Sequence, residues 1–275
     1  MKKTFRKFLI AILGAALSAS ALTACGKSVA SDDKKISIGV SPVPHAEIVK
    51  EVVKPILEKK GYELKIVEFN DYVQPNTSLE EGEIDANYFQ TARYLENENK
   101  ERELHLVSVA EIHLEPMGLY SKKYKSLTEI PDGADIAIPN DSSNESRALA
   151  LLADNGLITL SETDNLYNLT NIKDNPHNYS FSEIEAASLP VTLEDVDAAV
   201  INGNYALAAG YNPSGDSLLL ESVSSESIKQ YFNDLVVKSG NENSNKIKAL
   251  KEAMTSDEVK KYIEEKYKGS VIPAF

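Results

Sequence analysis

The stretch ISIGVSPVPHAEIVKEVVKPILEKKGYELKIVEF, residues 36–69, decides the fold class of this chain. It opens with alternating apolar and small residues, a pattern typical of a β-strand. Apolar residues then recur at helical spacing from Ile48 to Leu57, and Gly61 follows as a helix stop. A second strand is predicted at 64–69. A strand, a helix and a strand in so short a stretch predict a βαβ unit with parallel strands and a right-handed crossover.

The alternation of strands and helices continues on both sides of a polar, Asn-rich stretch at 160–181, which shows no clear pattern. Apolar runs predict strands and 3.6-residue periodicity predicts helices. Two helices end the chain, and Thr255 with Glu258 has the spacing of a capping box for the last one. The expected strands are 84–89, 104–109, 135–139, 196–201 and 235–238, and the expected helices are 94–103, 143–155 and 205–209.

Two breaks in the pattern divide the chain into two lobes. The first break is EPMG at 115–118, and the second is a Ser/Glu-rich segment at 222–227. We therefore expect lobe I to comprise residues 36–114 with 228–275, and lobe II residues 115–227. The predicted fold is an α/β protein of two lobes with two interlobe crossings. Ligands of such folds bind beyond the carboxyl ends of strands and at domain interfaces.

The N-terminus is predicted to be a lipoprotein signal peptide at residues 1–24. Four basic residues and no acid precede a short apolar run, which is the layout of a secretory signal. The sequence LTAC at 22–25 then resembles a bacterial lipobox, in which Cys25 carries lipid. Residues 25–35 would form a flexible leash. The alternative is a buried or free thiol after an ordinary signal, and a single cysteine permits no disulfide within one chain.

The charge argues against two kinds of partner. The formal net charge is −13, and loss of the four positive charges of the signal peptide leaves −17. A surface of this sign disfavours nucleic acid and direct adsorption to anionic lipid. Contact with a membrane would therefore depend on the lipid at Cys25.

Catalytic and metal-binding motifs are missing from the sequence. It has no Gly-x-Ser-x-Gly elbow, no phosphate loop and no His-Glu-x-x-His motif. The histidines are scattered, and Glu111 with His113, two residues apart, is a candidate metal pair to which we expect no further ligand to be added. His45 could lie at a pocket rim, whereas His105 and His113 are more typical of structural positions in or beside a strand. We expect no catalytic residue, no metal and no cofactor.

Aromatic and polar residues follow the ends of the predicted strands. FNDYVQPN at 69–76 follows one strand, and DANYFQ at 85–90 ends another, with Tyr94 one turn further on. Tyrosine and phenylalanine can form an apolar cage with polar tips. Because strand residues alternate in direction, we expect Tyr88 in the core and Phe89 in the pocket.

Lobe II offers charged and amide groups. Residues 138–147 lead from a strand into a helix, and Arg147 lies on the same helix face as Asn144. A guanidinium there can hold a carboxylate through two hydrogen bonds, although a surface pairing of Arg147 with Glu145 or a neighbour fits the spacing equally well. Another strand ends at Asn202, whose amide can accept from an ammonium. Aromatic, amide and guanidinium groups together suit a zwitterion with an apolar side chain.

These motifs are similar to those of the NlpA/MetQ family, the methionine-binding lipoproteins of ABC importers. The resemblance covers nearly the whole mature chain and rests on FNDYVxPN (69–76), DANYFQ (85–90), EPMGLYSKK (115–123), PND with Asn144 and Arg147, and VIN (200–202). It implies a type II periplasmic-binding-protein-like fold with mixed sheets and helices on both faces. It also implies a protein that closes on an amino acid and delivers it to a permease driven by an ATPase.

The resemblance further implies a set of ligand-binding residues. Tyr72, Phe89 and Tyr94 would form an aromatic wall. Arg147, beside Asn144, would bind the ligand carboxylate. Asn202 and Asn233 would bind the amino group. Thr91 stands where the family usually has a histidine, so the side-chain pocket could be roomier.

The sequence therefore favours a monomeric, non-enzymatic binding lipoprotein on the extracytoplasmic face of a membrane. Among the candidate ligands, it favours methionine. The substitution at Thr91 keeps open a dipeptide or another apolar amino acid. A surface adhesion lipoprotein and an amino-acid hydrolase are more distant alternatives. Adhesion would not need a pocket of this composition, and a hydrolase would need a nucleophile arrangement that the sequence lacks.

Overall fold

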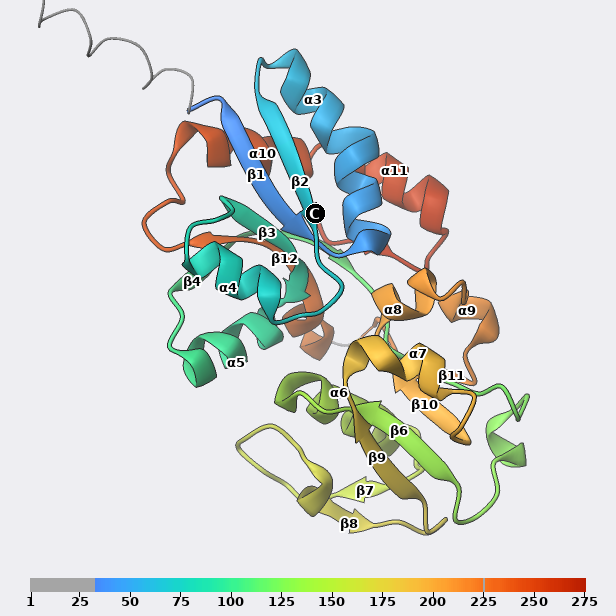
Figure 1. Ribbon diagram of the computed structural model, residues 1–275. Coiled ribbons are helices and arrows are strands. Elements are labelled where there is room, and N and C mark those ends of the chain that lie inside the picture. The colour runs from blue at the N-terminus through green and yellow to red at the C-terminus, as the bar shows by residue number, and fades with distance from the viewer. Residues whose placement is uncertain (1–32, 225) are drawn as a thin grey trace, which may run out of the picture.

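The computed structural model describes residues 33–224 and 226–275. The predicted signal peptide, Cys25 and residues 25–32 of the predicted leash lie outside the described residues. Lys35, the last residue assigned to that leash, is instead the first residue of strand β1. Two α/β lobes lie one above the other in Figure 1, which confirms the predicted two-lobed architecture.

Lobe I is built on a six-stranded mixed sheet in the order β13-β4-β12-β3-β1-β2. β1 pairs in parallel with β2 and β3, as predicted for the βαβ unit. β12 returns from the far end of the chain and runs antiparallel between β3 and β4. The strands are β1 (Lys35–Val40), β2 (Glu63–Glu68), β3 (Ala86–Thr91), β4 (Leu106–Leu114), β12 (Phe232–Lys238) and β13 (Ile272–Pro273).

Helices cover both faces of this sheet. One face packs α3, α10 and α11 against β1 in a cluster that contains Leu57, Leu250 and Ile263. The other face packs α4 and α5 through Leu79 and Leu95. The helices and turns of lobe I are η1 (Pro42–Ala46), η2 (Val49–Val53), α3 (Lys54–Lys59), α4 (Gln74–Glu80), α5 (Ala92–Arg102), η6 (Glu226–Tyr231), α10 (Asn245–Met254) and α11 (Asp257–Tyr267).

Pro55 shapes the first helix of the lobe. It lies in the first turn of α3, where a missing backbone donor is tolerated. The turn before it, η2, is π-helical, and the Lys54 N–H donates to the Val49 carbonyl five residues back. The helix is thus disturbed next to Pro55 in the form of a widened turn.

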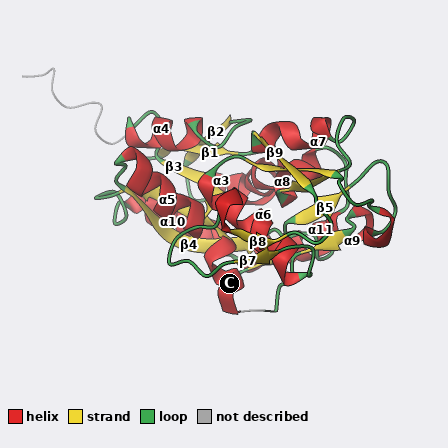
Figure 2. Ribbon diagram, turned by 90° about the horizontal axis from the view of Figure 1, so that it is seen from below, coloured by secondary structure: helices red, strands yellow, loops and turns green. Residues whose placement is uncertain are grey.

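Lobe II contains a five-stranded sheet in the order β11-β5-β10-β6-β9, again mixed, and a small β7-β8 hairpin. Figure 2 shows the molecule from below, with helices in red and strands in yellow. The strands are β5 (Gly118–Tyr120), β6 (Asp135–Pro139), β7 (Thr159–Leu160), β8 (Ile172–Asp174), β9 (Ser180–Ile184), β10 (Ala198–Ile201) and β11 (Leu219–Leu220). The helices and turns are η3 (Leu127–Glu129), α6 (Ser142–Asp154), η4 (Leu169–Asn171), η5 (Ala186–Ser188), α7 (Leu189–Thr192), α8 (Gly203–Ala208) and α9 (Pro213–Asp216).

The chain passes between the two sheets twice, from Leu114 to Gly118 and from Leu220 to Phe232. The first passage is packed tightly against α8. A Cβ atom added to Gly203, the first residue of α8, would lie 2.6 Å from Cβ of Glu115 and 3.3 Å from the Pro116 carbonyl. A glycine is therefore required where α8 meets the passage.

No helix among the described residues combines the length and the apolar character that a bilayer span needs.

The last helix begins one residue later than the sequence predicted. Ser256, not Thr255, is the N-cap of α11, and its hydroxyl accepts from the Val259 N–H. Thr255 ends α10 instead, and its hydroxyl donates to the Lys251 carbonyl. The capping box predicted from Thr255 and Glu258 is wrong because the preceding helix extends through that turn.

Replacement of Ser256 by alanine should lower the free energy of unfolding by about 1 kcal/mol, since the helix loses its N-terminal acceptor. Thr255→Ala is the matched control and should cost clearly less. Urea unfolding of both variants measures the difference as a shift in midpoint at constant slope. Equal losses in the two variants would contradict the assignment of the cap.

Candidate functional site

A pocket lies between the lobes, and every side chain that the sequence analysis nominated for ligand binding lines it. The pocket contains about 320 Å³ of space not filled by protein atoms, part of it open solvent. Its lining is aromatic on the side of lobe I and rich in amides on the side of lobe II. The lining residues are Tyr72, Phe89, Gln90, Thr91, Tyr94, Asn144, Arg147, Asn202, Asn204 and Asn233.

Three aromatic rings of lobe I form one wall. The ring centroid of Tyr72 lies 5.8 Å from that of Phe89 and 5.7 Å from that of Tyr94, and Phe89 and Tyr94 are 6.1 Å apart. Such spacings are typical of aromatic pairs in contact. The Tyr94 hydroxyl donates to the Tyr72 carbonyl at 3.2 Å and so ties α5 to the loop after β2. Tyr88 points the other way and is fully buried in the lobe I core.

Thr91 ends β3 and is also the N-cap of α5. Its Oγ1 accepts from the Tyr94 N–H at 3.2 Å. The Thr91 hydroxyl is therefore engaged by the helix, and it fixes the start of the helix that carries Tyr94.

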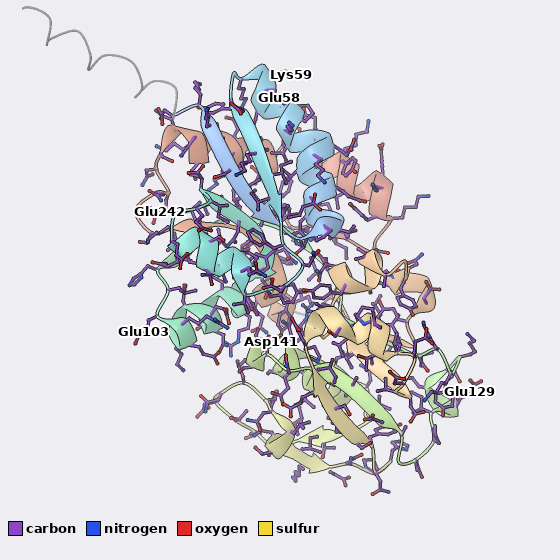
Figure 3. All side chains as sticks on the ribbon, in the orientation of Figure 1. Glu58, Lys59, Glu103, Glu129, Asp141 and Glu242 are labelled. Carbon is purple, nitrogen blue, oxygen red and sulfur yellow. The ribbon has the colours of Figure 1, made fainter. Side chains whose placement is uncertain are left out.

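Two asparagines of lobe II are linked in series. Asp141, the N-cap of α6, accepts from the Asn144 side chain at 3.0 Å, and Asn144 Oδ1 accepts from Asn202 Nδ2 at 2.7 Å. Figure 3 places Asp141 between the lobes. The Oδ1 atom of Asn202 is buried and has no partner among the described residues. An unpaired buried acceptor is costly, so this oxygen is suited to a donor supplied by a ligand.

Arg147 is buried and paired with an acid that the sequence did not indicate. Its Nε donates to Oε1 of Glu221 at 2.9 Å, and its Nη2 donates to Oε2 at 2.5 Å. Nη2 also donates to the Glu115 carbonyl at 2.9 Å, and the guanidinium lies 4.3 Å from the ring centroid of Tyr231. Burial acts to lower the pKa of Arg147, but Glu221, with smaller contributions from Tyr231 and Glu115, outweighs burial and raises that pKa.

The surface pairing of Arg147 with Glu145, kept open from the sequence, does not occur. Glu145 turns away and accepts from the Leu169 N–H at 3.0 Å. Arg147 is 4% exposed, so it is not a surface residue.

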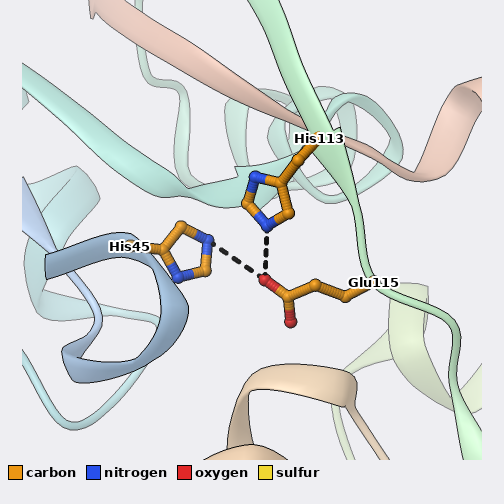
Figure 4. Close-up of side chains that lie close together, drawn as sticks. All are labelled: His45, His113 and Glu115. Carbon is orange, nitrogen blue, oxygen red and sulfur yellow. Dashed lines mark hydrogen bonds and ion pairs between the residues drawn. The ribbon is translucent and has the colours of Figure 1, made fainter. Parts of the chain in front are cut away.

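Two of the four histidines meet behind the pocket, so the expectation of scattered histidines was wrong for this pair. Figure 4 shows His45 and His113 converging on one oxygen of Glu115. His113 Nε2 lies 2.6 Å from Glu115 Oε1, and His45 Nε2 lies 3.4 Å from the same atom. His45 Nε2 also donates to Asn233 Oδ1 at 3.0 Å, which connects the cluster to the pocket wall. The sequence could not predict this contact, because the two histidines are far apart along the chain. They meet because β4 and the turn after β1 come together in the folded sheet.

This histidine–glutamate cluster contains residue types that bind zinc. Ligands bound about 2.0–2.2 Å from one zinc ion lie more than about 3 Å from one another in tetrahedral geometry. The 2.6 Å separation of His113 Nε2 and Glu115 Oε1 is instead that of a hydrogen bond. His113 Nδ1 is also hydrogen-bonded, to the Tyr88 hydroxyl at 2.5 Å. The described arrangement is therefore a hydrogen-bonded cluster.

Burial controls the charge of the cluster. It lowers the pKa of His113 to about 3 and that of His45 to about 4, while the Glu115 carboxylate opposes the shift at His45. It raises the pKa of Glu115, against the lowering effect of His45 and Arg147. Both histidines are consequently neutral near pH 7.

Sequence reasoning missed three residues around the pocket. Gln90 joins a buried amide network in which its Nε2 donates to Asn76 Oδ1 and Asn87 Oδ1. Asn204 Oδ1 accepts from the Tyr72 hydroxyl at 2.5 Å across the lobes. Gln90 stands inside the quoted motif DANYFQ, and Asn204 follows the motif VIN by two residues, so both could have been found there. Nothing in the sequence linked Glu221 to Arg147.

Comparison with known proteins gives consistent results. Residues 36–275 match the family model described as NlpA lipoprotein. The chain is 40% identical over 280 residues to the methionine-binding lipoprotein MetQ of Bacillus subtilis, with 99% of each chain covered.

Two solved structures are similar throughout. A lipoprotein from Ruminococcus gnavus is 48% identical with a TM-score of 0.85, covering 88% of this chain and all of that one. A nutrient-binding protein from Burkholderia cenocepacia bound to methionine is 43% identical with a TM-score of 0.82, covering 87% of this chain and all of that one.

The buried histidines predict how stability depends on pH. The pKa of a histidine in the unfolded chain is about 6.5, whereas the pKa of folded His113 is about 3. Between these pH values the unfolded chain binds more protons than the folded protein. The free energy of unfolding therefore falls as the pH falls. Between pH 7 and pH 5 the ligand-free wild type should lose about 2 kcal/mol more than His113→Gln. Urea unfolding at both pH values measures this. His105→Gln, at a side chain that is 73% exposed, is the control and should follow the wild type. Parallel curves for wild type and His113→Gln would contradict the neutral state of His113.

Proposed function

Because this chain belongs to the NlpA lipoprotein family, we propose that it is the substrate-binding lipoprotein of an ABC importer. We propose that its ligand is an amino acid and that methionine is the preferred one. The observation that carries the proposal is the pocket between the lobes, where an aromatic wall faces amides and a guanidinium. The proposed partners are a membrane permease and its ATPase subunit, and the protein acts as a monomer.

Each part of a zwitterionic amino acid has a matching group. The unpaired Oδ1 of Asn202 accepts from the ammonium. The carboxylate meets Arg147 and the Nδ2 of Asn233, whose Oδ1 is already engaged by His45. This differs from the sequence expectation, which assigned Asn233 to the amino group. An apolar side chain lies against the rings of Tyr72 and Phe89.

Capture would proceed by closure of the lobes at the two passages between the sheets, with lobe II proposed to span residues 115–227. Two hydrogen bonds already join the lobes at the pocket. Tyr72 donates to Asn204 across the lobes, and the Tyr205 hydroxyl donates to the Asn70 carbonyl at 3.2 Å. The rings of Tyr72 and Tyr205 also pack 4.9 Å apart. Release of a ligand requires these contacts to break.

The second candidate keeps the transport function and changes the ligand to a dipeptide or another apolar amino acid. The short side chain of Thr91 in the pocket wall favours it. The residues that line the pocket disfavour enzymatic hydrolysis. The Thr91 hydroxyl serves as a helix cap, and the other hydroxyls of the lining are the ring hydroxyls of Tyr72 and Tyr94. The lining therefore contains neither a serine nor a cysteine of the kind that hydrolases use as a nucleophile. An adhesion function would leave the pocket unexplained.

Isothermal titration calorimetry on unfolded and refolded protein tests the proposal, since refolding removes any ligand carried through purification. L-methionine, other apolar amino acids and dipeptides are the probes. Binding of L-methionine tighter than the other probes is expected. Binding of a different solute alone would replace the ligand and keep the transport function, and no binding of any amino acid or dipeptide would overturn the function.

Asn202→Ala should weaken methionine binding about 10- to 100-fold, because it removes a hydrogen bond to a charged group. Calorimetry on the refolded variant measures the loss. Asn155→Ala is the control, since Asn155 is an exposed amide that caps the end of α6 outside this pocket. An unchanged dissociation constant for Asn202→Ala would remove Asn202 from the proposed ligand contacts.

The proposed location is the extracytoplasmic face of a membrane, with lipid on Cys25 as the anchor. Cys25→Ser should leave the affinity for methionine unchanged, because the pocket is built from residues after 71, and should release the protein from the membrane fraction. Fractionation of cells that express either form, with calorimetry on both, measures the two properties. A variant that stays in the membrane fraction would show that something other than Cys25 anchors the chain.

A further inference from the structure

The pairing of Arg147 with Glu221 changes what the pocket offers to a ligand. Two of the three guanidinium nitrogens, Nε and Nη2, are already used by the two oxygens of Glu221, in the fork-like geometry that guanidinium and carboxylate prefer. Nη1 donates to no described residue. An incoming carboxylate therefore meets one remaining nitrogen of a cation whose charge is already matched.

Glu221 is held in place as firmly as its partner. Its side chain is 11% exposed, and its Oε2 also accepts from the Met117 N–H at 3.2 Å. Met117 belongs to the first passage between the sheets, and Glu221 begins the second, just after β11. The acid is thus positioned by backbone on both passages, and the ion pair would survive the arrival of a ligand.

Other acids near the pocket have other partners. Glu115 directs its carboxylate to His113 and His45, and Asp141 accepts from Asn144. Glu221 is therefore the acid that compensates Arg147. With that compensation, the pocket as a whole carries no excess positive charge to attract an anion.

We propose that Glu221 is a specificity-determining residue that makes the pocket select a zwitterionic amino acid over an anion with the same carboxylate and side chain. This inference rests on the proposed function and adds that the pocket discriminates between ligands by their net charge. A zwitterion brings its own positive charge, which the unpaired oxygen of Asn202 can receive. An anion brings a negative charge that the paired Arg147 no longer balances, and burial of an unbalanced charge is unfavourable.

A purely structural function of Glu221 makes a different prediction. If the acid only held Arg147 in place, its removal would weaken all carboxylate ligands alike. If it sets the net charge, its neutralisation would favour anions over zwitterions. The ratio of two dissociation constants separates these cases, because changes common to both ligands cancel in it.

The experiment compares L-methionine with its 2-hydroxy analogue, 2-hydroxy-4-(methylthio)butanoate, which keeps the carboxylate and side chain and has no ammonium. Calorimetry on refolded wild type should give a dissociation constant at least about 10-fold lower for L-methionine. Glu221→Gln, which keeps the shape and removes the charge, should shift the ratio toward the hydroxy acid by at least about 10-fold.

Two further variants control for structure. Glu145→Gln neutralises another buried acid, in the first turn of α6, whose carboxylate accepts from the Leu169 N–H and not from Arg147. The ratio of its two dissociation constants should therefore equal that of the wild type. Glu221→Asp keeps the charge with a shorter side chain, so its ratio should stay near the wild-type value even if both ligands bind more weakly.

The outcomes are distinguishable. Binding of methionine with an unchanged ratio in Glu221→Gln would overturn the inference and leave the proposed function intact. If Glu221→Gln does not fold, the wild type still decides, because equal affinity for both ligands would overturn the inference. Failure of the wild type to bind any amino acid or hydroxy acid would overturn the proposed function itself and this inference with it.

Discussion

The two lobes depend on a network of contacts around Glu115, in the short passage between β4 and β5. Its carboxylate lies against His113 of lobe I, its carbonyl accepts from Arg147 of lobe II, and its Cβ allows only a glycine at position 203. Any relative movement of the lobes must therefore keep or exchange these contacts. This constraint places the guanidinium of Arg147 and the start of α8 at fixed positions around one backbone segment.

The pocket is surrounded by buried polar groups that are nearly all satisfied by one another. The amide network of Asn76, Asn87 and Gln90 lies on one side, and the histidine–glutamate cluster lies behind Asn233. Satisfied networks of this kind fix side-chain orientation, because each member loses a partner if it turns. The Oδ1 of Asn202 stands out against this background, since it is a buried polar atom of a pocket-lining residue with no partner among the described residues.

The sequence predicted the architecture well because hydrophobic periodicity and strand-end motifs are local signals. The strand at 135–139 and the helices around α5 and α6 were predicted within a few residues of their bounds. The helix α4 was missed because its residues QPNTSLE carry little apolar periodicity. The nominated residues line one pocket, and their contact with a ligand stays a prediction.

Partners distant in sequence were harder to predict. Glu221 is far along the chain from Arg147, and only the folded positions of β11 and α6 bring them into contact. His45 and His113 likewise meet because β1 and β4 belong to one sheet.

Thr91 contributes both to the stability of a helix and to the shape of the pocket. Its hydroxyl begins α5, and its side chain also borders the space that a ligand side chain would occupy. Residues that cap helices well are small and polar, so a lineage that enlarged this side chain to reshape the pocket would forfeit the cap and need stabilisation elsewhere. Ligand preference at this position is thus subject to epistasis with the stability of the helix, and the order in which substitutions accumulate would decide which specificities such a protein could reach.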